Sequence, residues 1–250
     1  MPENQSHIAA AFPIESQTSP ADKSFILASI AFVSGISKTY SYVEIGSYMG
    51  GSLAPFLMDP QCRRILSIDE RGRRQPDERG LKYDYTGITN QTMIDNLRAH
   101  GISTDKLRTY DGSVDDMPPP GEQFDLAFID GEHTDVACVR DFLWLQPMMA
   151  SNSLIMFHDS YLVYKALRII QVFLAKSGLP FRFVKNPDSE MSGIFLGAFS
   201  NEDLAAAFGA AENPEDFYAS SEARLISDLI ANRVDIQVNY MIKPPATRTA

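Results

Sequence analysis

The sequence predicts an α/β protein built on a doubly wound, mostly parallel sheet of seven strands with one antiparallel edge strand. Three observations support this fold class. Short apolar segments alternate with segments of helical periodicity from about residue 42 to residue 176. The last two apolar segments have no helix between them, so one of these strands must run antiparallel at the edge. A content of 44% hydrophobic residues in 250 is enough for a sizeable core.

Each element follows from local signals. A helix is predicted to begin after Ser19, because a serine N-cap, Pro20 and an acidic Asp22 are typical of a helix start, and to end near Gly35. The seven predicted strands cover residues 42–45, 65–68, 107–110, 124–129, 153–157, 181–184 and 193–199. The helices between them are predicted up to residue 58, around 93–97, at 134–146 and at 162–176.

This pattern divides the chain into three parts. Residues 1–18 are polar and irregular, and we expect a flexible arm. Residues 19–200 carry the alternating strands and helices of the main domain. Residues 201–250 form a helical appendage and tail, with helices at 203–208 and 214–231 before an extended end around Pro244-Pro245. Such an appendage suits a contact in a homodimer or higher homo-oligomer.

Composition restricts the partners. A net charge of -10 repels a nucleic-acid backbone, so no nucleic-acid partner is expected. The N-terminus has no basic residue before its short apolar stretch, and the uncharged run of residues 24–37 is too short to cross a bilayer. The two cysteines have no metal-ligand or disulfide spacing. We therefore expect a cytoplasmic protein without a membrane partner.

A glycine-rich turn follows the first predicted strand, in the segment V-E-I-G-S-Y-M-G-G-S of residues 43–52. A dinucleotide fingerprint needs glycine at position 48, and Tyr48 there argues against NAD. The spacing from Glu44 through Gly46 to Gly50 suits the methionine end of S-adenosylmethionine, although a turn that serves only tight packing would look similar. Asp69 ends the second strand 23 residues after Gly46, where a carboxylate can accept both ribose hydroxyls.

Four motifs in this order resemble class I S-adenosylmethionine-dependent methyltransferases, and within them the catechol-type and macrocin-type O-methyltransferases. They lie at residues 43–52, 68–69, 124–133 and 157–159, and the resemblance covers about residues 40–200. It implies a Rossmann-like class I methyltransferase sheet. It also implies that the cofactor is bound by Glu44, Gly46, Ser47, Tyr48, Gly50, Ser52, Asp69, Ser113 and Asp130.

Two carboxylates follow neighbouring strands, Asp130 after the fourth and Asp159 after the fifth, and both should open onto one cleft. A hydroxyl nucleophile has a pKa far above 7, so its methylation needs a base, a metal ion or both. By resemblance, His133 stands at the general-base position of the macrolide-sugar enzymes, and Asp130 matches a catalytic metal ligand. Alternatively, each aspartate only caps the following helix.

The sequence is compatible with a reaction that uses a divalent metal ion and with one that does not. Metal-dependent relatives have two oxygen ligands side by side where this chain has His158 and Asp159. Magnesium prefers oxygen ligands, whereas manganese, iron or zinc tolerates imidazole better. The predicted metal ligands are Asp130, Asp159 and His158.

The sequence thus predicts methyl transfer from S-adenosylmethionine to a hydroxyl of a small molecule, such as a sugar or a phenol of secondary metabolism. Two alternatives stay open: a metal-assisted, hydroxylase-like oxidoreductase on the same scaffold, and a non-catalytic nucleoside-binding or assembly protein. The tyrosines Tyr83, Tyr85 and Tyr161 are candidates for the acceptor pocket. The arginines Arg71, Arg73 and Arg74 are interpreted as part of a solvated loop, with contact to an anionic acceptor as the alternative.

Overall fold

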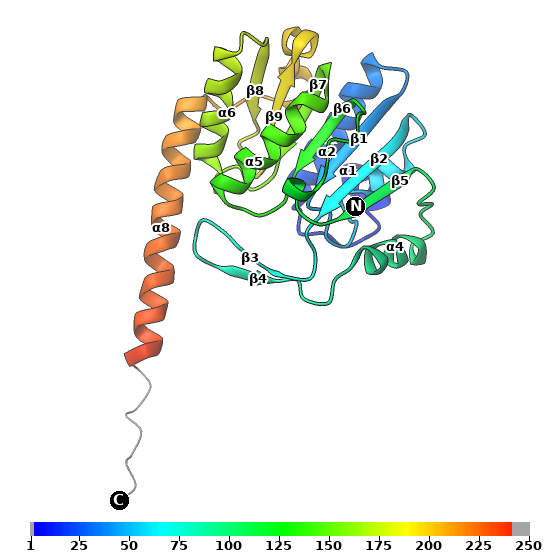
Figure 1. The fold of residues 1–250 in the computed structure, drawn as a ribbon. Coiled ribbons are helices and arrows are strands. Elements are labelled where there is room, and N and C mark those ends of the chain that lie inside the picture. The colour runs from blue at the N-terminus through cyan, green and yellow to red at the C-terminus, as the bar shows by residue number, and fades with distance from the viewer. Residues whose placement is uncertain (1–2, 242–250) are drawn as a thin grey trace, which may run out of the picture.

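The computed structural model describes the backbone of residues 3–241 and the side chains of residues 6–232. One twisted sheet forms the middle layer, helices cover both of its faces, and the long helix α8 (Pro214–Met241) runs along one side and beyond the body (Figure 1). The predicted extended end around Pro244-Pro245 lies outside the described residues. Within those residues, no helix has both the length and the apolar character needed to cross a membrane.

The sheet has seven strands in the order β5-β2-β1-β6-β7-β9-β8. Their bounds are β1 Tyr40–Ile45, β2 Cys62–Asp69, β5 Leu107–Asp111, β6 Phe124–Ile129, β7 Met149–Phe157, β8 Phe181–Lys185 and β9 Ser192–Leu196. The first five strands in chain order pair in parallel, and β9 pairs antiparallel with both β7 and β8. The predicted fold class is confirmed; the antiparallel strand is β9, with β8 outside it.

Two apolar layers hold the helices on the sheet because side chains alternate between its faces. Val43 and Ile45 of β1 pack toward the side of α5 and α6, and Tyr40 and Tyr42 pack toward the side of α2 and α4. The helices other than α8 are α1 Glu3–Ala11, α2 Pro20–Ile36, α3 Ala54–Met58, α4 Asn90–Ala99, α5 Asp135–Leu145, α6 Tyr164–Lys176 and α7 Leu204–Phe208. Short 3-10 turns lie at Val114–Asp116, Gln146–Met148 and Gly197–Asn201.

Three expectations were wrong. The N-terminal part is not irregular throughout, because α1 is helical and Phe12 and Ile14 after it are buried in the core. The segment after β2 contains a small hairpin, β3 (Arg74–Pro76) and β4 (Lys82–Asp84), whose short, charged strands carry no alternating apolar signal. Helix α8 continues ten residues past position 231, since nothing in its sequence breaks the helix there.

The chain order of the strands determines where a ligand can bind. From β1 the chain moves to β2 and β5 on one side, and then returns to β6 and β7 on the other side. The crevice at the carboxyl ends of β1 and β6 is therefore the topological switch point, where doubly wound sheets bind ligands.

Candidate active site

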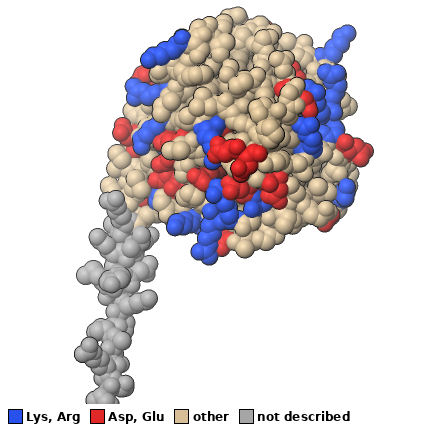
Figure 2. Space-filling view, viewed as in Figure 1, with Lys and Arg blue, Asp and Glu red and all other residues tan. Residues whose placement is uncertain are grey.

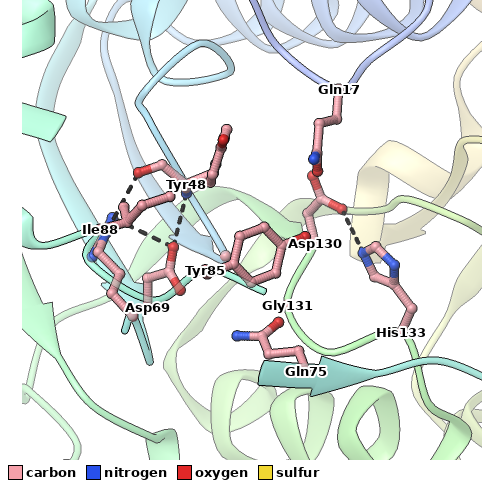
Figure 3. A pocket seen from close by; sticks show the side chains of 11 residues that line it. Gln17, Tyr48, Asp69, Gln75, Tyr85, Ile88, Asp130, Gly131 and His133 are labelled. Carbon is pink, nitrogen blue, oxygen red and sulfur yellow. Dashed lines mark hydrogen bonds and ion pairs between the residues drawn. The ribbon is translucent and has the colours of Figure 1, made fainter. Parts of the chain in front are cut away.

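Two adjoining pockets open at this switch point. The first is lined by Gln17, Gly46, Tyr48, Asp69, Arg71, Gln75, Tyr85, Ile88, Asp130, Gly131 and His133 (Figure 3). The second shares Gly46, Asp69, Gln75 and Gly131 with the first and extends to Ser113. Five of the nine predicted cofactor residues, Gly46, Tyr48, Asp69, Ser113 and Asp130, thus line one continuous cleft.

Gly46 is required where β1 ends against the end of β6. Its φ is +89°, and a Cβ added to it would lie 2.0 Å from the carbonyl oxygen of Asp130. Only glycine allows these two backbones to meet so closely. Among the described residues, two that are not glycine have a left-handed backbone, Tyr48 with φ +43° and Asp159 with φ +45°. Tyr48 lines the first pocket, and Asp159 contacts His133, which lines it too; strained residues are often found at functional sites.

Asp69 stabilises the glycine turn through hydrogen bonds to its backbone. Its carboxylate accepts hydrogen bonds from the backbone N–H groups of Ser47 (3.0 Å) and Tyr48 (2.8 Å). Arg71 lies 3.5 Å from the same carboxylate and donates to the Ser47 hydroxyl (2.6 Å) and to Asn90 (2.5 Å). The interpretation of Arg71 as solvated is wrong: the side chain is buried and belongs to the turn.

Glu44 lies apart from the two pockets. It shares the face of β1 that carries Tyr42, and its carboxylate accepts hydrogen bonds from the hydroxyls of Tyr42 (2.7 Å) and Ser52 (2.5 Å). Complete burial raises the pKa of Glu44 to about 8, although these two hydrogen bonds act in the opposite direction. Neither Glu44 nor Ser52 lines either of these two pockets, and Gly50 packs against Leu97 of α4.

Glu44→Gln is expected to make the free energy of unfolding less dependent on pH. Burial raises the folded-state pKa of Glu44 from 4.5 to about 8, so its stabilising contribution is complete below pH 4.5 and is lost as the pH rises through about 8. The wild type should lose up to about 1.4 kcal/mol per pH unit from this group alone. Urea unfolding at pH 5 to 8 measures this loss of stability, and Glu222→Gln, at an exposed position, is the control. If the free energy of unfolding changed equally with pH in the wild type and in Glu44→Gln, the expectation would be contradicted.

A cluster of aspartates and histidines lies beside the first pocket. The Nε2 atom of His133 lies 3.2 Å from Asp159 Oδ2 and 3.6 Å from Asp130 Oδ1. The potential ligand atoms of Asp130, His133 and Asp159 all lie within 4.8 Å of one another. In the part of the chain that the structure describes, this is the one group of histidine, cysteine and acidic side chains with metal-site geometry. Neither aspartate caps a helix, because the N-caps of α5 and α6 are Thr134 and Val163.

His158 is not part of this potential metal group, although the sequence predicted it as a ligand. Its Nδ1 atom lies 3.0 Å from Asp159 and 3.3 Å from Asp130, and its Nε2 atom lies 3.4 Å from Asp22 of α2. The buried ring is thus surrounded by three carboxylates. Burial disfavours the imidazolium, but the charges and hydrogen bonds of these carboxylates outweigh it and raise the pKa of His158 well above its usual value.

Asp22 is a site residue that the sequence did not reveal. The predicted N-cap Ser19 is present and forms a capping box with Asp22, with backbone-to-side-chain hydrogen bonds of 2.8 and 3.2 Å. The same carboxylate also accepts hydrogen bonds from Ser189 (2.7 Å) and from the backbone of Glu190 (2.8 Å), in the loop between β8 and β9. Asp22 therefore ties the first helix of the domain and this loop to His158.

The charges of the cluster also shift the pKa values of His133 and Asp159. Burial disfavours a charged His133, but its hydrogen bond to Asp130 and the charge of Asp159 raise its pKa. Burial also disfavours a charged Asp159, but the hydrogen bond from His158 and the charges of both histidines lower its pKa to about 2. The cluster therefore favours carboxylates paired with imidazolium rings.

The three candidate tyrosines lie at different places around the cleft. Tyr85 lines the first pocket, and its ring centroid is 5.4 Å from that of Tyr48. Tyr83 lies 6.3 Å from the ring of His133. The hydroxyls of Tyr83 and Tyr161 both accept hydrogen bonds from Arg79, of 2.8 and 3.0 Å. The hairpin β3–β4 thus forms one wall of the site.

Comparisons with known proteins agree with this geometry. Residues 43–160 match the model of a family described as a methyltransferase domain. Uncharacterized protein R132 of Acanthamoeba polyphaga mimivirus is 25% identical over 122 residues, which are 48% of this chain and 51% of that protein. The chain therefore spans about half the length of the curated relative it matches.

Solved structures share the fold. The O-methyltransferase NovP has a TM-score of 0.58 at 14% identity, with 72% of this chain and 80% of NovP covered. The O-methyltransferase TomG from Streptomyces achromogenes, solved in complex with S-adenosylmethionine, has a TM-score of 0.50 at 13% identity, with 79% of this chain and 91% of TomG covered. Residues 43–160 thus match a methyltransferase-domain model, and the chain shares its doubly wound fold with solved O-methyltransferases.

Proposed function

We propose that the protein transfers the methyl group of S-adenosylmethionine to an oxygen atom of a small molecule. One observation carries this proposal: the pocket bounded by the glycine turn and Asp69 opens directly onto Asp130 and His133. A donor bound along the turn would point its reactive end at a group that can remove a proton. NovP and TomG, whose names describe O-methyltransferases, support oxygen as the acceptor atom.

The proposed chemistry is a direct displacement. The acceptor oxygen forms a bond to the methyl carbon, the carbon–sulfur bond breaks, and its electron pair stays on the sulfur. Holding the two reactants in line supplies much of the acceleration of such a reaction. His133 accepts the hydroxyl proton, and the carboxylates of Asp130 and Asp159 stabilise the imidazolium that forms.

The proposal has a second form, in which the same side chains bind a divalent metal ion. Two carboxylates and one imidazole, those of Asp130, Asp159 and His133, fit an ion that accepts nitrogen as well as oxygen, such as manganese or zinc, better than magnesium. When bound, such an ion would lower the pKa of the acceptor hydroxyl. The two roles of His133 exclude each other, because the nitrogen that binds a metal ion cannot also take up the proton.

Binding and product analysis test the proposed function. By calorimetry, we expect the protein to bind S-adenosylmethionine and S-adenosylhomocysteine and not NAD, because Tyr48 replaces the glycine on which a pyrophosphate would lie. With an acceptor library, we expect products heavier by one methylene unit. Tight NAD binding without a response to S-adenosylhomocysteine would refute the proposal. Oxygen consumption would instead identify a hydroxylase, and cofactor binding without turnover a binding protein.

Several finer expectations belong to the same proposal. The acceptor is a sugar or phenolic hydroxyl of secondary metabolism, the protein acts in the cytoplasm, and residues 201–250 contribute to a homo-oligomer. Acidic side chains gather in the middle of the face drawn in Figure 2, near the end of the sheet toward which the strands point. This distribution and the net charge of -10 support the absence of a nucleic-acid partner.

A further inference from the structure

We propose that Tyr85, on the segment that follows β4, forms with Tyr48 an aromatic wall against the positively charged sulfonium of the methyl donor. Tyr85 would then be a cofactor-contacting residue that distinguishes the donor from its product. The inference rests on the proposed function, because it requires S-adenosylmethionine in the first pocket.

The geometry of the two rings carries the inference. Tyr48 and Tyr85 both line the first pocket, together with Gly46 and Asp130. Their ring centroids lie 5.4 Å apart and the ring planes are inclined by 61°, so the two rings meet as adjoining walls instead of stacking. Figure 3 shows the ring of Tyr85 between the side of the pocket that holds Tyr48 and Asp69 and the side that holds Asp130.

Tyr85 is held in place from several directions. Its backbone N–H donates to the carbonyl oxygen of Arg73 (3.2 Å), and its carbonyl oxygen accepts from Ile88 (3.1 Å). The ring of Tyr83 lies nearly parallel to the ring of Tyr85, with the two centroids 6.4 Å apart. A half-buried ring with these contacts is a built part of the pocket wall.

The charge of the donor explains why an aromatic wall belongs here. The sulfonium is a cation, and aromatic faces attract cations through their quadrupole. Burial and the charge of Asp130 raise the pKa of Tyr85 to about 12, so the phenol stays neutral and acts through its ring. Transfer of the methyl group leaves the sulfur as a neutral thioether. The wall therefore attracts the donor and has no such attraction for the product.

This difference between donor and product gives a specific test. Calorimetry would measure the binding of S-adenosylmethionine and S-adenosylhomocysteine to the wild type, Tyr85→Leu and Tyr85→Phe. We expect Tyr85→Leu to weaken binding of S-adenosylmethionine by roughly 5- to 30-fold and to leave S-adenosylhomocysteine within about 2-fold. Tyr85→Phe keeps the ring and loses the hydroxyl, so it should bind both ligands like the wild type.

Phe173→Leu is the control, because it removes a partly exposed ring on α6 that lines neither pocket; its ratio of the two affinities should equal that of the wild type. An equal loss of both ligands in Tyr85→Leu would overturn the inference and assign the residue a packing role. Tighter binding of both would overturn it too, and would show that the ring obstructs the pocket. A wild type that binds neither ligand would refute the proposed function itself.

Discussion

Replacing His133 by alanine is expected to lower turnover by about 10²–10⁴-fold and to leave the affinity for S-adenosylmethionine unchanged. The side chain faces Asp130 and Asp159, so its loss removes the proton acceptor without disturbing the turn that Asp69 holds. Steady-state kinetics and calorimetry on the same preparations measure the two quantities. His100→Ala, on the surface at the end of α4, is the control and should behave like the wild type.

The pH profile of the same variant is a second readout. A general base acts in its deprotonated form, and the surrounding carboxylates raise the pKa of His133 above its usual value of about 6.5. Turnover of the wild type should therefore rise with pH through this raised pKa. In His133→Ala that rise should disappear, and the loss should become smaller at high pH, where the acceptor hydroxyl ionises unaided. Full activity of His133→Ala at neutral pH would exclude His133 as the base.

The strands and the switch point could be predicted because their signals are local. Most of the seven strands contain a short apolar run, and the parallel direction of the first five follows from the helical segments between them. The face of the sheet on which Glu44 lies could also be predicted from the sequence. Alternation along β1 puts Glu44 on the face of Tyr42 and Tyr40, and not on the face of Ile45, which lines the second pocket.

Contacts across long separations could not be predicted in this way. Asp22 and His158 are 136 positions apart, and only the folded sheet brings them within 3.4 Å. Arg71 looked solvated because its neighbours in sequence are charged, yet it reaches back under the turn to Ser47. In both cases the pairing of a buried charge is decided by tertiary structure, because burial without a partner would be too costly.

The single substitutions Asp130→Asn and Asp159→Asn are expected to have the next largest effect on turnover. Each carboxylate lies close to both histidines. Asp130 is 3.3 Å from His158 and 3.6 Å from His133, and Asp159 is 3.0 Å from His158 and 3.2 Å from His133. Removing one charge leaves buried imidazolium groups less well paired, which costs stability and lowers the pKa of both rings. We expect turnover to fall by at least about 10-fold and the Michaelis constant for the acceptor to rise.

The same two variants decide between the two roles of His133. With His133 as the base, chelator should leave the wild type active, and the rise of turnover with pH should shift to lower pH in Asp159→Asn, because the carboxylate that raises the pKa of His133 is gone. Turnover against pH, in chelator and with added magnesium, manganese or zinc, measures both effects. Activity that is lost in chelator, restored by manganese or zinc, and not restored in Asp130→Asn or Asp159→Asn would show that the three side chains bind a metal ion. The role of base would then pass from His133 to another group, because its Nε2 atom would be a metal ligand.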